Sequence, residues 1–236
     1  MSKPFFSILI LFWQSEQYLQ RCLQSLLEQT YQDFEVILLN NGASQPPDPE
    51  VLSNFRDLEI KQIHSDINLG FAGGNNLAAK SAAGEYLILL NGDAFPEPSW
   101  LATLHQAAQT HPGHCFASRL LQADNSALLD GEWNVYHASG LAWRKNHNQP
   151  AARSATSPQL VMSACAAASA YPRMAFEQAG GLMRISSLTW KTLTLICACS
   201  WLGILFSTCR KPLSGISALA APATAVTLPP ITGSAT

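Results

Sequence analysis

The last 55 residues of this 236-residue chain contain no aspartate, no glutamate and no histidine. All 16 acidic residues lie between Glu16 and Glu177, whereas an apolar run and a tail of Ala, Thr, Pro and Ser follow Gly181. The chain therefore has two parts of different amino-acid composition, residues 1–181 and residues 182–236. Chemistry that needs a carboxylate is confined to the first part.

Other absences narrow the class of protein. The formal net charge is −2 and no basic stripe is present, which argues against nucleic acid as a partner. The N-terminal apolar run has no small-residue cleavage site after it, so we interpret it as a buried strand and not as a signal peptide. The six cysteines show no paired metal-ligand spacing. We therefore expect a reducing, cytoplasmic setting.

Apolar segments of strand length alternate with amphipathic segments of helix length. This order predicts an α/β fold, Rossmann-like, with a mostly parallel sheet and helices on both faces. The predicted strands are Ser7–Trp13, Phe34–Leu39, Glu59–His64 and Tyr86–Leu90. The predicted helices are Glu16–Gln29, Glu50–Arg56, Asn76–Ala83 and a helix that begins near Pro98.

Polar clusters follow three of the predicted strands. They are Asn40-Asn41-Gly42, the glycine-rich stretch Asn68–Asn76, and Asn91-Gly92-Asp93. Because ligands of parallel α/β sheets bind beyond the carboxyl ends of the strands, we expect these clusters to form a site.

Each cluster taken alone has two interpretations. Asn91 and Asp93 are two residues apart, so both oxygens can share a hard cation with phosphate; the alternative is an Asx turn that caps the helix near Pro98. The sequence GFAGGNN either contacts phosphate or ribose or is only a tight turn.

The motifs together resemble the family 2 inverting glycosyltransferases, especially their rhamnosyltransferase-like branch. The resemblance rests on LLEQTYQDFEVILL, then NLGFAGGNN, then LNGDA, and it covers residues 5–181. It implies a GT-A fold, a nucleoside diphosphate sugar donor, and a glycan or lipid-linked acceptor. It also implies that Mg²⁺ or Mn²⁺ bridges the donor diphosphate at the aspartate of a DxD-type motif, which is Asp93 here.

Two strand-end positions depart from this family. Asn91 stands at the first acidic position of the metal motif, and Asn40 stands where the family usually has an aspartate that accepts a hydrogen bond from uracil or thymine. An amide oxygen also accepts. Trp13 either covers the nucleobase or plugs the end of its strand. The resemblance places nucleotide-sugar contacts at Phe12, Trp13, Asn40, Asn41, Gly42, Asn68, Gly70, Phe71, Gly74, Asn75, Asn76 and Asn91.

The resemblance stops at Gly181. In this family the next segment carries an acidic pair that supplies the general base, because the acceptor hydroxyl must lose a proton as it attacks. This chain instead reads GLMRISSLTWKTLTLICACSWLGIL, without an acid. If one T is missing just before Met183, the bases fixed by the observed codons fit FDEDFFAYLEDVDLDLRLQLAGY. We therefore hypothesise that residues 182–236 are read out of frame and that the catalytic base is lost.

Two other interpretations of the C-terminal part stay open. Thr192–Thr208 is uncharged and is followed by Arg210-Lys211, which is compatible with a short membrane segment or with association at the inner face of the membrane. Residues 217–236 are poor in bulky side chains, so we expect no regular structure there. The chain is then a transferase fragment, a catalytically inactive nucleotide-sugar-binding protein, or a membrane-anchored interaction protein.

Overall fold

The fold is taken from a computed structural model of the chain. It describes residues 3–13, 15–137, 139, 141–154, 159–161, 163–182 and the backbone of 218–228. Thr192–Thr208, for which a membrane segment is one of the open interpretations, lies outside the described residues. Within the described part, no helix is long and apolar enough to cross a membrane.

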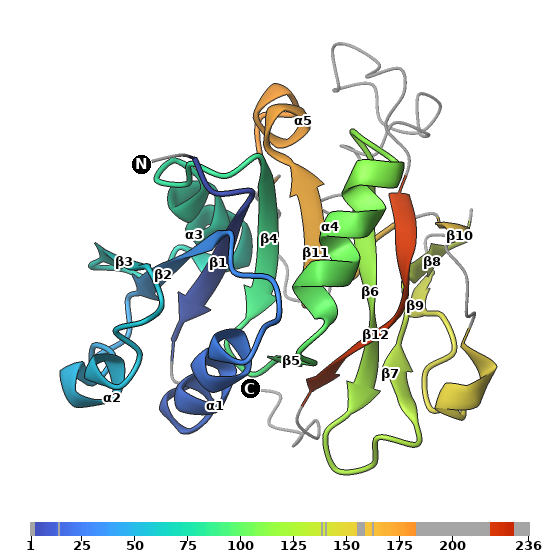
Figure 1. Cartoon of the computed structure of the whole chain (residues 1–236), viewed down its shortest axis with the longest axis horizontal. Helices are drawn as coiled ribbons and strands as arrows, with labels where there is room; N and C mark the ends of the chain where they lie inside the picture. Colours follow the sequence, from blue (N-terminus) through green and yellow to red (C-terminus); the bar gives the residue numbers. More distant parts are fainter. Residues whose placement is uncertain are drawn as a thin grey trace.

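A large mixed sheet forms the centre of the molecule (Figure 1). Among the described residues it has ten strands in the order β10-β12-β6-β11-β4-β1-β2-β3, with β5 beside β12 and β7 beside β6. Its strands are β1 (Phe6–Phe12), β2 (Phe34–Asn41), β3 (Ile60–Ser65), β4 (Tyr86–Asn91), β5 (Phe95–Pro96), β6 (Cys115–Gln122), β7 (Leu129–Gly131), β10 (Gln159–Val161), β11 (Ala168–Pro172) and β12 (Ala218–Leu228). A separate hairpin pairs β8 (Asn134–Tyr136) with β9 (Ala142–Arg144).

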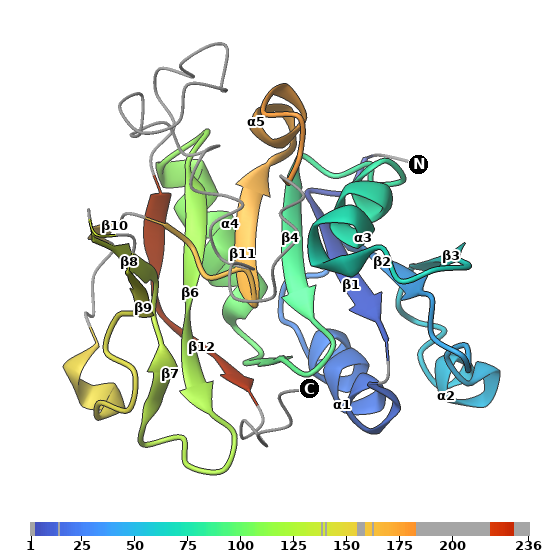
Figure 2. The ribbon, with the colours of Figure 1, turned by 180° about the vertical axis from the view of Figure 1, so that it is seen from behind.

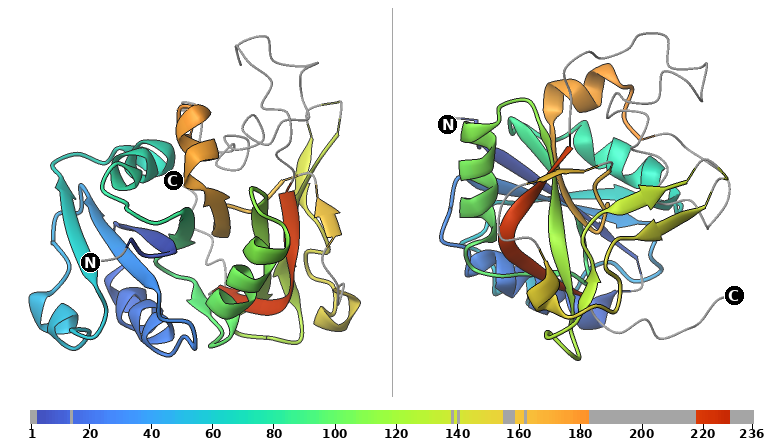
Figure 3. Two further views of the ribbon diagram at one scale, coloured as in Figure 1. Left: turned by 45° about the horizontal axis from the view of Figure 1, so that its top comes forward. Right: turned by 90° about the vertical axis from the view of Figure 1, so that its right-hand side faces the viewer.

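Helices cover both faces of this sheet, as Figures 2 and 3 show. One face carries α1, α2 and α4, and the other carries α3 and α5. The helices are α1 (Glu16–Leu27), α2 (Pro49–Ser53), α3 (Gly70–Ala79), α4 (Trp100–Thr110), α5 (Arg173–Gln178) and the 3-10 turn η1 (Ala151–Arg153).

The predicted α/β class is confirmed, and the four predicted strands are β1 to β4. These four strands are parallel to one another. The other half of the sheet was not predicted: β11 runs antiparallel to both β4 and β6.

Alternating side chains of the central strands fill two apolar cores. On β1, Ile8 and Ile10 pack with the α1 and α4 layer, and Leu9 packs with the α3 and α5 layer. Because successive strand residues point to opposite faces, a run that is apolar at every position is buried on both sides. The same alternation decides on which face each residue at the strand end lies.

The helix predicted at Asn76–Ala83 is wrong in its bounds. Helix α3 begins at Gly70, so the glycine-rich stretch forms its first turns and is not a loop. Glycine disfavours helices, but Gly74 packs closely here: a Cβ at this position would lie 3.0 Å from a Leu11 methyl. Tertiary contact with β1 therefore overrides local propensity.

The expectation that residues 217–236 lack regular structure is wrong for Ala218–Leu228. These residues form β12, which pairs in parallel with β6 and antiparallel with β10 and β5. Its register shifts between Ala220 and Ala225, where Pro222 has no N–H to donate. Almost any sequence can pair through its backbone N–H and C=O groups with an open strand edge. The presence of β12 therefore does not show whether residues 182–236 are read in frame.

A buried polar network ties β1, β2 and the turn before β4 together. Ser7 Oγ donates to Glu35 Oε1 at 2.6 Å, and the Ala83 N–H donates to the same oxygen at 2.7 Å. The Gly84 N–H in turn donates to Ser7 Oγ at 2.8 Å. Since Glu35 is only 5% exposed, no water replaces it as acceptor for these groups.

We predict that Glu35→Ala lowers the free energy of unfolding by about 2–3 kcal/mol, because it leaves a buried hydroxyl and a buried N–H without their acceptor. Glu35→Gln is the control, since its amide oxygen keeps both acceptor positions. Urea denaturation of the three proteins measures the difference. Equal midpoints for the alanine and glutamine variants would contradict this role.

Candidate functional site

The carboxyl ends of β2, β1 and β4 bring the predicted site residues onto one rim. In the register of the sheet, Phe12 lies beside Asn40 and Leu11 lies beside Asn91. Neighbouring strands are about 4.8 Å apart, so these positions are close. In Figure 1 the arrowheads of β1 and β4 point to this lower edge of the sheet.

The Asn41 side chain connects this rim to the start of α3. Its Oδ1 accepts the Leu69 N–H at 3.0 Å, and its Nδ2 donates to Asn68 Oδ1 at 3.1 Å and to the Gly70 carbonyl at 3.4 Å. Asn68 Oδ1 also accepts the Gly70 N–H at 2.8 Å. Asn41 is only 4% exposed. It therefore acts on the turn at residues 68–70, whose backbone it holds in place.

Two glycines permit this arrangement, Gly42 by its close approach to Asn68 and Gly70 by its positive φ. Gly42 has φ +75°, and a Cβ on it would lie 2.3 Å from the Asn68 nitrogen. Gly70 has φ +70° at the first position of α3. Since the first turn of a helix leaves N–H groups without helical partners and carries the positive end of the helix dipole, this turn presents an environment suited to an anion.

Phe12 and Asn40 lie on the opposite face from Asn41. Phe12 packs in the core layer of α1. Asn40 is 5% exposed, and its Oδ1 accepts the Ala43 N–H at 2.9 Å. Trp13 follows the end of β1 and is 47% exposed. The strand end thus presents a free aromatic ring, whereas the Phe12 ring is buried.

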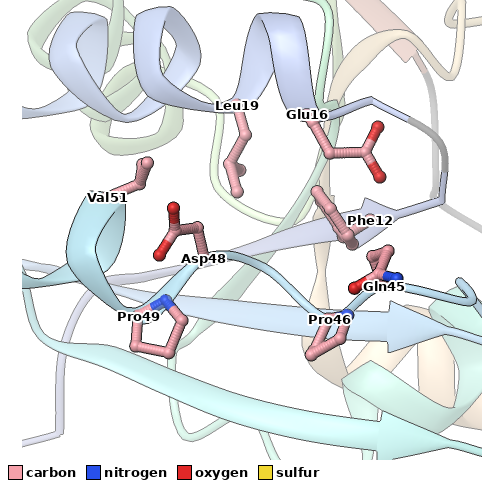
Figure 4. A pocket seen from close by; sticks show the side chains of 8 residues that line it. All are labelled: Phe12, Glu16, Leu19, Gln45, Pro46, Asp48, Pro49 and Val51. Carbon is pink, nitrogen blue, oxygen red and sulfur yellow. The ribbon is translucent and has the colours of Figure 1, made fainter.

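A cavity of about 470 Å³ lies on this α1 side of the rim (Figure 4). Glu16 and Leu19 reach it from α1, and Val51 reaches it from α2. Asp48 also caps α2, because its Oδ1 accepts the Glu50 N–H at 2.8 Å. The cavity is lined by Phe12, Glu16, Leu19, Gln45, Pro46, Asp48, Pro49 and Val51. These eight residues include two carboxylates and no basic side chain, so the cavity disfavours phosphate.

The loop Asn91-Gly92-Asp93 crosses the rim beside the start of α1. The Ala94 N–H donates to the Asn91 carbonyl at 3.0 Å, which closes the loop. A Cβ on Gly92 would lie 3.4 Å from Ser15 Oγ. Burial raises the pKa of the Cys22 thiol to about 12, and the nearby Asp93 carboxylate adds to the rise. Asp93 is therefore close to α1, and the Cys22 thiol stays protonated at neutral pH.

The Asp93 loop fits a divalent cation only if a ligand completes its coordination. Among the described residues, no group of three or more His, Cys, Asp or Glu side chains is placed to hold a metal. Mg²⁺ commonly uses one or two carboxylates and takes its remaining oxygens from substrate phosphates and water. Asp93 together with the amide oxygen of Asn91 is compatible with such a site.

The polar ends of Asn75 and Asn76 are engaged inside the protein. Asn75 is 1% exposed and donates to the Phe71 carbonyl at 2.9 Å. Asn76 bonds both backbone groups of Leu182, donating to its carbonyl at 2.8 Å and accepting its N–H at 2.7 Å. Gly74 packs on Leu11 and is buried. Nucleotide contact by these residues stays a prediction, and the contacts seen here position α3.

Several residues next to the rim were not predicted from the sequence as site residues. Ser15 precedes α1, and its Oγ is buried and has no hydrogen-bond partner among the described residues. Glu16 and Asp48 line the cavity. Asp48 had a detectable signal, because Asp-Pro-Glu is a typical helix start. Ser15 had none beyond its place between a strand and a helix.

We predict that Asn41→Asp loosens the turn at residues 68–70. The new carboxylate still accepts the hydrogen bond from the Leu69 N–H, but it has no N–H to donate to Asn68 Oδ1 or to the Gly70 carbonyl. We therefore expect the free energy of unfolding to fall by about 1–3 kcal/mol. Asn40→Asp is the matched control, because its oxygen still accepts the Ala43 N–H. Urea denaturation and amide exchange at Leu69 and Gly70 measure the effect. Similar exchange rates in both variants would exclude this role for Asn41.

Sequence comparison relates the chain to bacterial glycosyltransferases. It is 30% identical over 103 residues to an uncharacterized glycosyltransferase of Haemophilus influenzae, covering 42% of this chain and 31% of that protein. It is 36% identical over 108 residues to the O-antigen biosynthesis protein RfbC of Myxococcus xanthus, covering 45% of this chain and 8% of that protein. The chain thus spans less than half the length of these relatives.

Solved structures share the fold. A crystal structure of GalNAc-T7 with UDP, GalNAc and Mn²⁺ matches with a TM-score of 0.70 at 15% identity, over 97% of this chain and 44% of that one. S. aureus TarS 1-349 in complex with UDP-GlcNAc matches with a TM-score of 0.65 at 16% identity, over 99% and 60%. The sequence profile of Glycosyl transferase family 2 matches residues 7–180, and the chain belongs to this family.

Proposed function

We propose that this chain is the donor-binding half of an inverting glycosyltransferase. It binds a nucleoside diphosphate sugar, and the intact protein transfers the sugar to a polysaccharide or lipid-linked acceptor. The observation that carries the proposal is the convergence of the turn at residues 68–70, the end of β2 and the Asp93 loop on one rim of a family 2 chain.

The diphosphate belongs on the α3 side of this rim. The turn held by Asn41 presents the N-terminal end of α3, which favours negative charge. The cavity on the α1 side carries Glu16 and Asp48, which would repel phosphate. We therefore assign the diphosphate to the space between residues 68–70 and Asp93, and the nucleobase to the exposed ring of Trp13.

Uridine or thymidine nucleotides are the proposed donors. Asn40 Oδ1 accepts one hydrogen bond from the Ala43 N–H, and an amide oxygen has a second lone pair that can accept from a pyrimidine ring N–H. TarS structures with UDP and UDP-GlcNAc share this fold. For the sugar we propose rhamnose, because the motifs resemble the rhamnosyltransferase-like branch.

The acceptor is proposed to be a surface glycan or its lipid-linked precursor. RfbC is named for O-antigen biosynthesis, and another similar protein is named a teichoic acid poly(glycerol phosphate) polymerase. We place the protein in the cytoplasm at the inner face of the membrane, where nucleotide sugars and lipid-linked acceptors meet.

This arrangement gives a role to three residues of the rim, Asp93, Asn91 and Asn41. Asp93 and Asn91 would hold Mg²⁺ or Mn²⁺, and a bound ion would supply positive charge beside the donor diphosphate. Asn41 holds the turn at 68–70, so that the N-terminal end of α3, which favours negative charge, faces the same phosphates. The general base that takes the acceptor proton is assigned to the segment after Leu182, which has no acid in this chain.

That missing acid favours a second candidate. If the last 55 residues are the natural sequence, the chain binds nucleotide sugars without transferring them. Donor binding is common to both candidates, whereas sugar transfer separates them.

We predict that the chain binds uridine or thymidine diphosphate in the presence of Mn²⁺ and that Asp93→Ala abolishes the metal-dependent part. Ligand binding to the folded state raises the melting temperature, so thermal shift with and without Mn²⁺ measures it, and isothermal titration gives the affinity. Asp124→Ala, in the exposed turn after β6, is the control. Unchanged nucleotide affinity in Asp93→Ala would refute the metal assignment, and no nucleotide binding by the wild type would refute the function.

We also predict that inserting one base ahead of the Met183 codon restores transfer. Loss of a general base alone slows a reaction by about 10²–10⁴-fold, so the repaired chain turns over a labelled donor at least that much faster. Gene sequencing in the source and assay of both chains with a lipid-linked acceptor test this. Equal turnover by both chains would show that the base lies elsewhere and that residues 182–236 belong to the enzyme.

A further inference from the structure

The β8–β9 hairpin presents one face to solvent. Val135 pairs with Trp143, and the His137 N–H continues the ladder by donating to the Leu141 carbonyl at 2.9 Å. Alternation along a strand therefore puts these four side chains on the same face. Lys145, two residues beyond Trp143, is also exposed. We call Val135, His137, Leu141, Trp143 and Lys145 the outer hairpin face.

The opposite side of the hairpin is fastened to the protein. Asn134 is 3% exposed and donates to the Ala164 carbonyl at 3.2 Å. Its cross-strand partner Arg144 donates to the buried Asp130 carboxylate. These inward contacts fix which face of the hairpin points out, so the exposure of the outer hairpin face is built into the fold.

Large apolar side chains gather on this side of the molecule. Leu141 is 66% exposed and Trp143 is 50% exposed. Leu160, on β10, is 74% exposed, and β10 ends two residues before Ser163, whose carbonyl accepts the Asn134 N–H of the hairpin. Contiguous exposed apolar groups in a soluble domain mark a contact with another surface.

The charge around these side chains has one sign. The sequence contains no acidic residue from position 133 to position 176, although Lys145 and Arg153 are exposed there. The nearest preceding acids, Asp130 and Glu132, are 5% and 4% exposed. Asp130 binds Arg144, and Glu132 accepts from Asn146 and Ser154. The outer hairpin face is thus apolar with a cationic rim.

We propose that the outer hairpin face docks on an anionic lipid bilayer. Tryptophan belongs at the membrane interface, aliphatic side chains insert below it, and lysine attracts anionic headgroups. Leucine side chains gain little from stacking on a sugar ring but gain from contact with acyl chains, so bilayer lipid is favoured over a glycan. The inference is independent of the donor chemistry, and it orients the membrane against the hairpin end of the sheet.

Vesicle sedimentation of the full chain tests this surface. We expect binding to vesicles of phosphatidylcholine with phosphatidylglycerol and much weaker binding to phosphatidylcholine alone. Leu141→Ser/Trp143→Ser should weaken binding to the anionic vesicles about tenfold, and Lys145→Glu about fivefold at low salt. The control is Met174→Ser, which removes an equally exposed side chain (71%) on α5.

A conservative variant keeps the test valid if the double variant folds poorly. Vesicles with brominated acyl chains should quench tryptophan fluorescence of the wild type, and Trp143→Phe, which keeps the other five tryptophans, should be quenched less than the wild type while binding within about twofold. All variants retain residues 183–217, so binding carried by that apolar sequence is unchanged across the series. Equal binding by wild type and double variant, quenching of Trp143→Phe equal to that of the wild type, or no binding by the wild type would overturn the proposal.

Discussion

The side-chain amide of Asn41 is the contact on which the rest of the site depends. It bonds Asn68, Leu69 and Gly70 from the end of β2, and it joins two segments that lie 27–29 residues apart in the chain. Without it, the Leu69 N–H and the Gly70 carbonyl lose the bonds that tie the turn before α3 to the end of β2. The N-terminus of α3 and the strand ends would then no longer be aligned to face one ligand.

The pleat of the strands divides the rim into two chemical environments. Asn41 faces α3 and holds the turn before it, so the positive end of the α3 dipole lies at this edge. One residue earlier, Asn40 faces the α1 layer, and its neighbour on β1, Phe12, lines a cavity together with carboxylates and apolar side chains. A ligand with a charged diphosphate at one end and a neutral ring at the other is matched to such a boundary, since only the α3 side favours negative charge.

The sequence indicated the parallel half of the fold because strands buried on both faces are apolar at every position, as in Phe34–Leu39. It also located the strand-end clusters, since such sheets bind ligands there. It did not indicate that GFAGGNN is helical, because the packing of Gly74 on Leu11 is tertiary. The antiparallel strand β11 was missed for a similar reason: its alanine-rich sequence is short and its partners, β4 and β6, are remote in the chain.

Hydrogen–deuterium exchange with uridine diphosphate and Mn²⁺ locates the ligand on the chain and so tests where the diphosphate binds. We predict slower exchange in peptides that cover residues 40–43, 67–72 and 91–94, and unchanged exchange in α4, which lies on the opposite face of the sheet from α3. Slowing confined to the α1 and α2 cavity, or no change at residues 67–72, would contradict the assignment of the diphosphate to the start of α3.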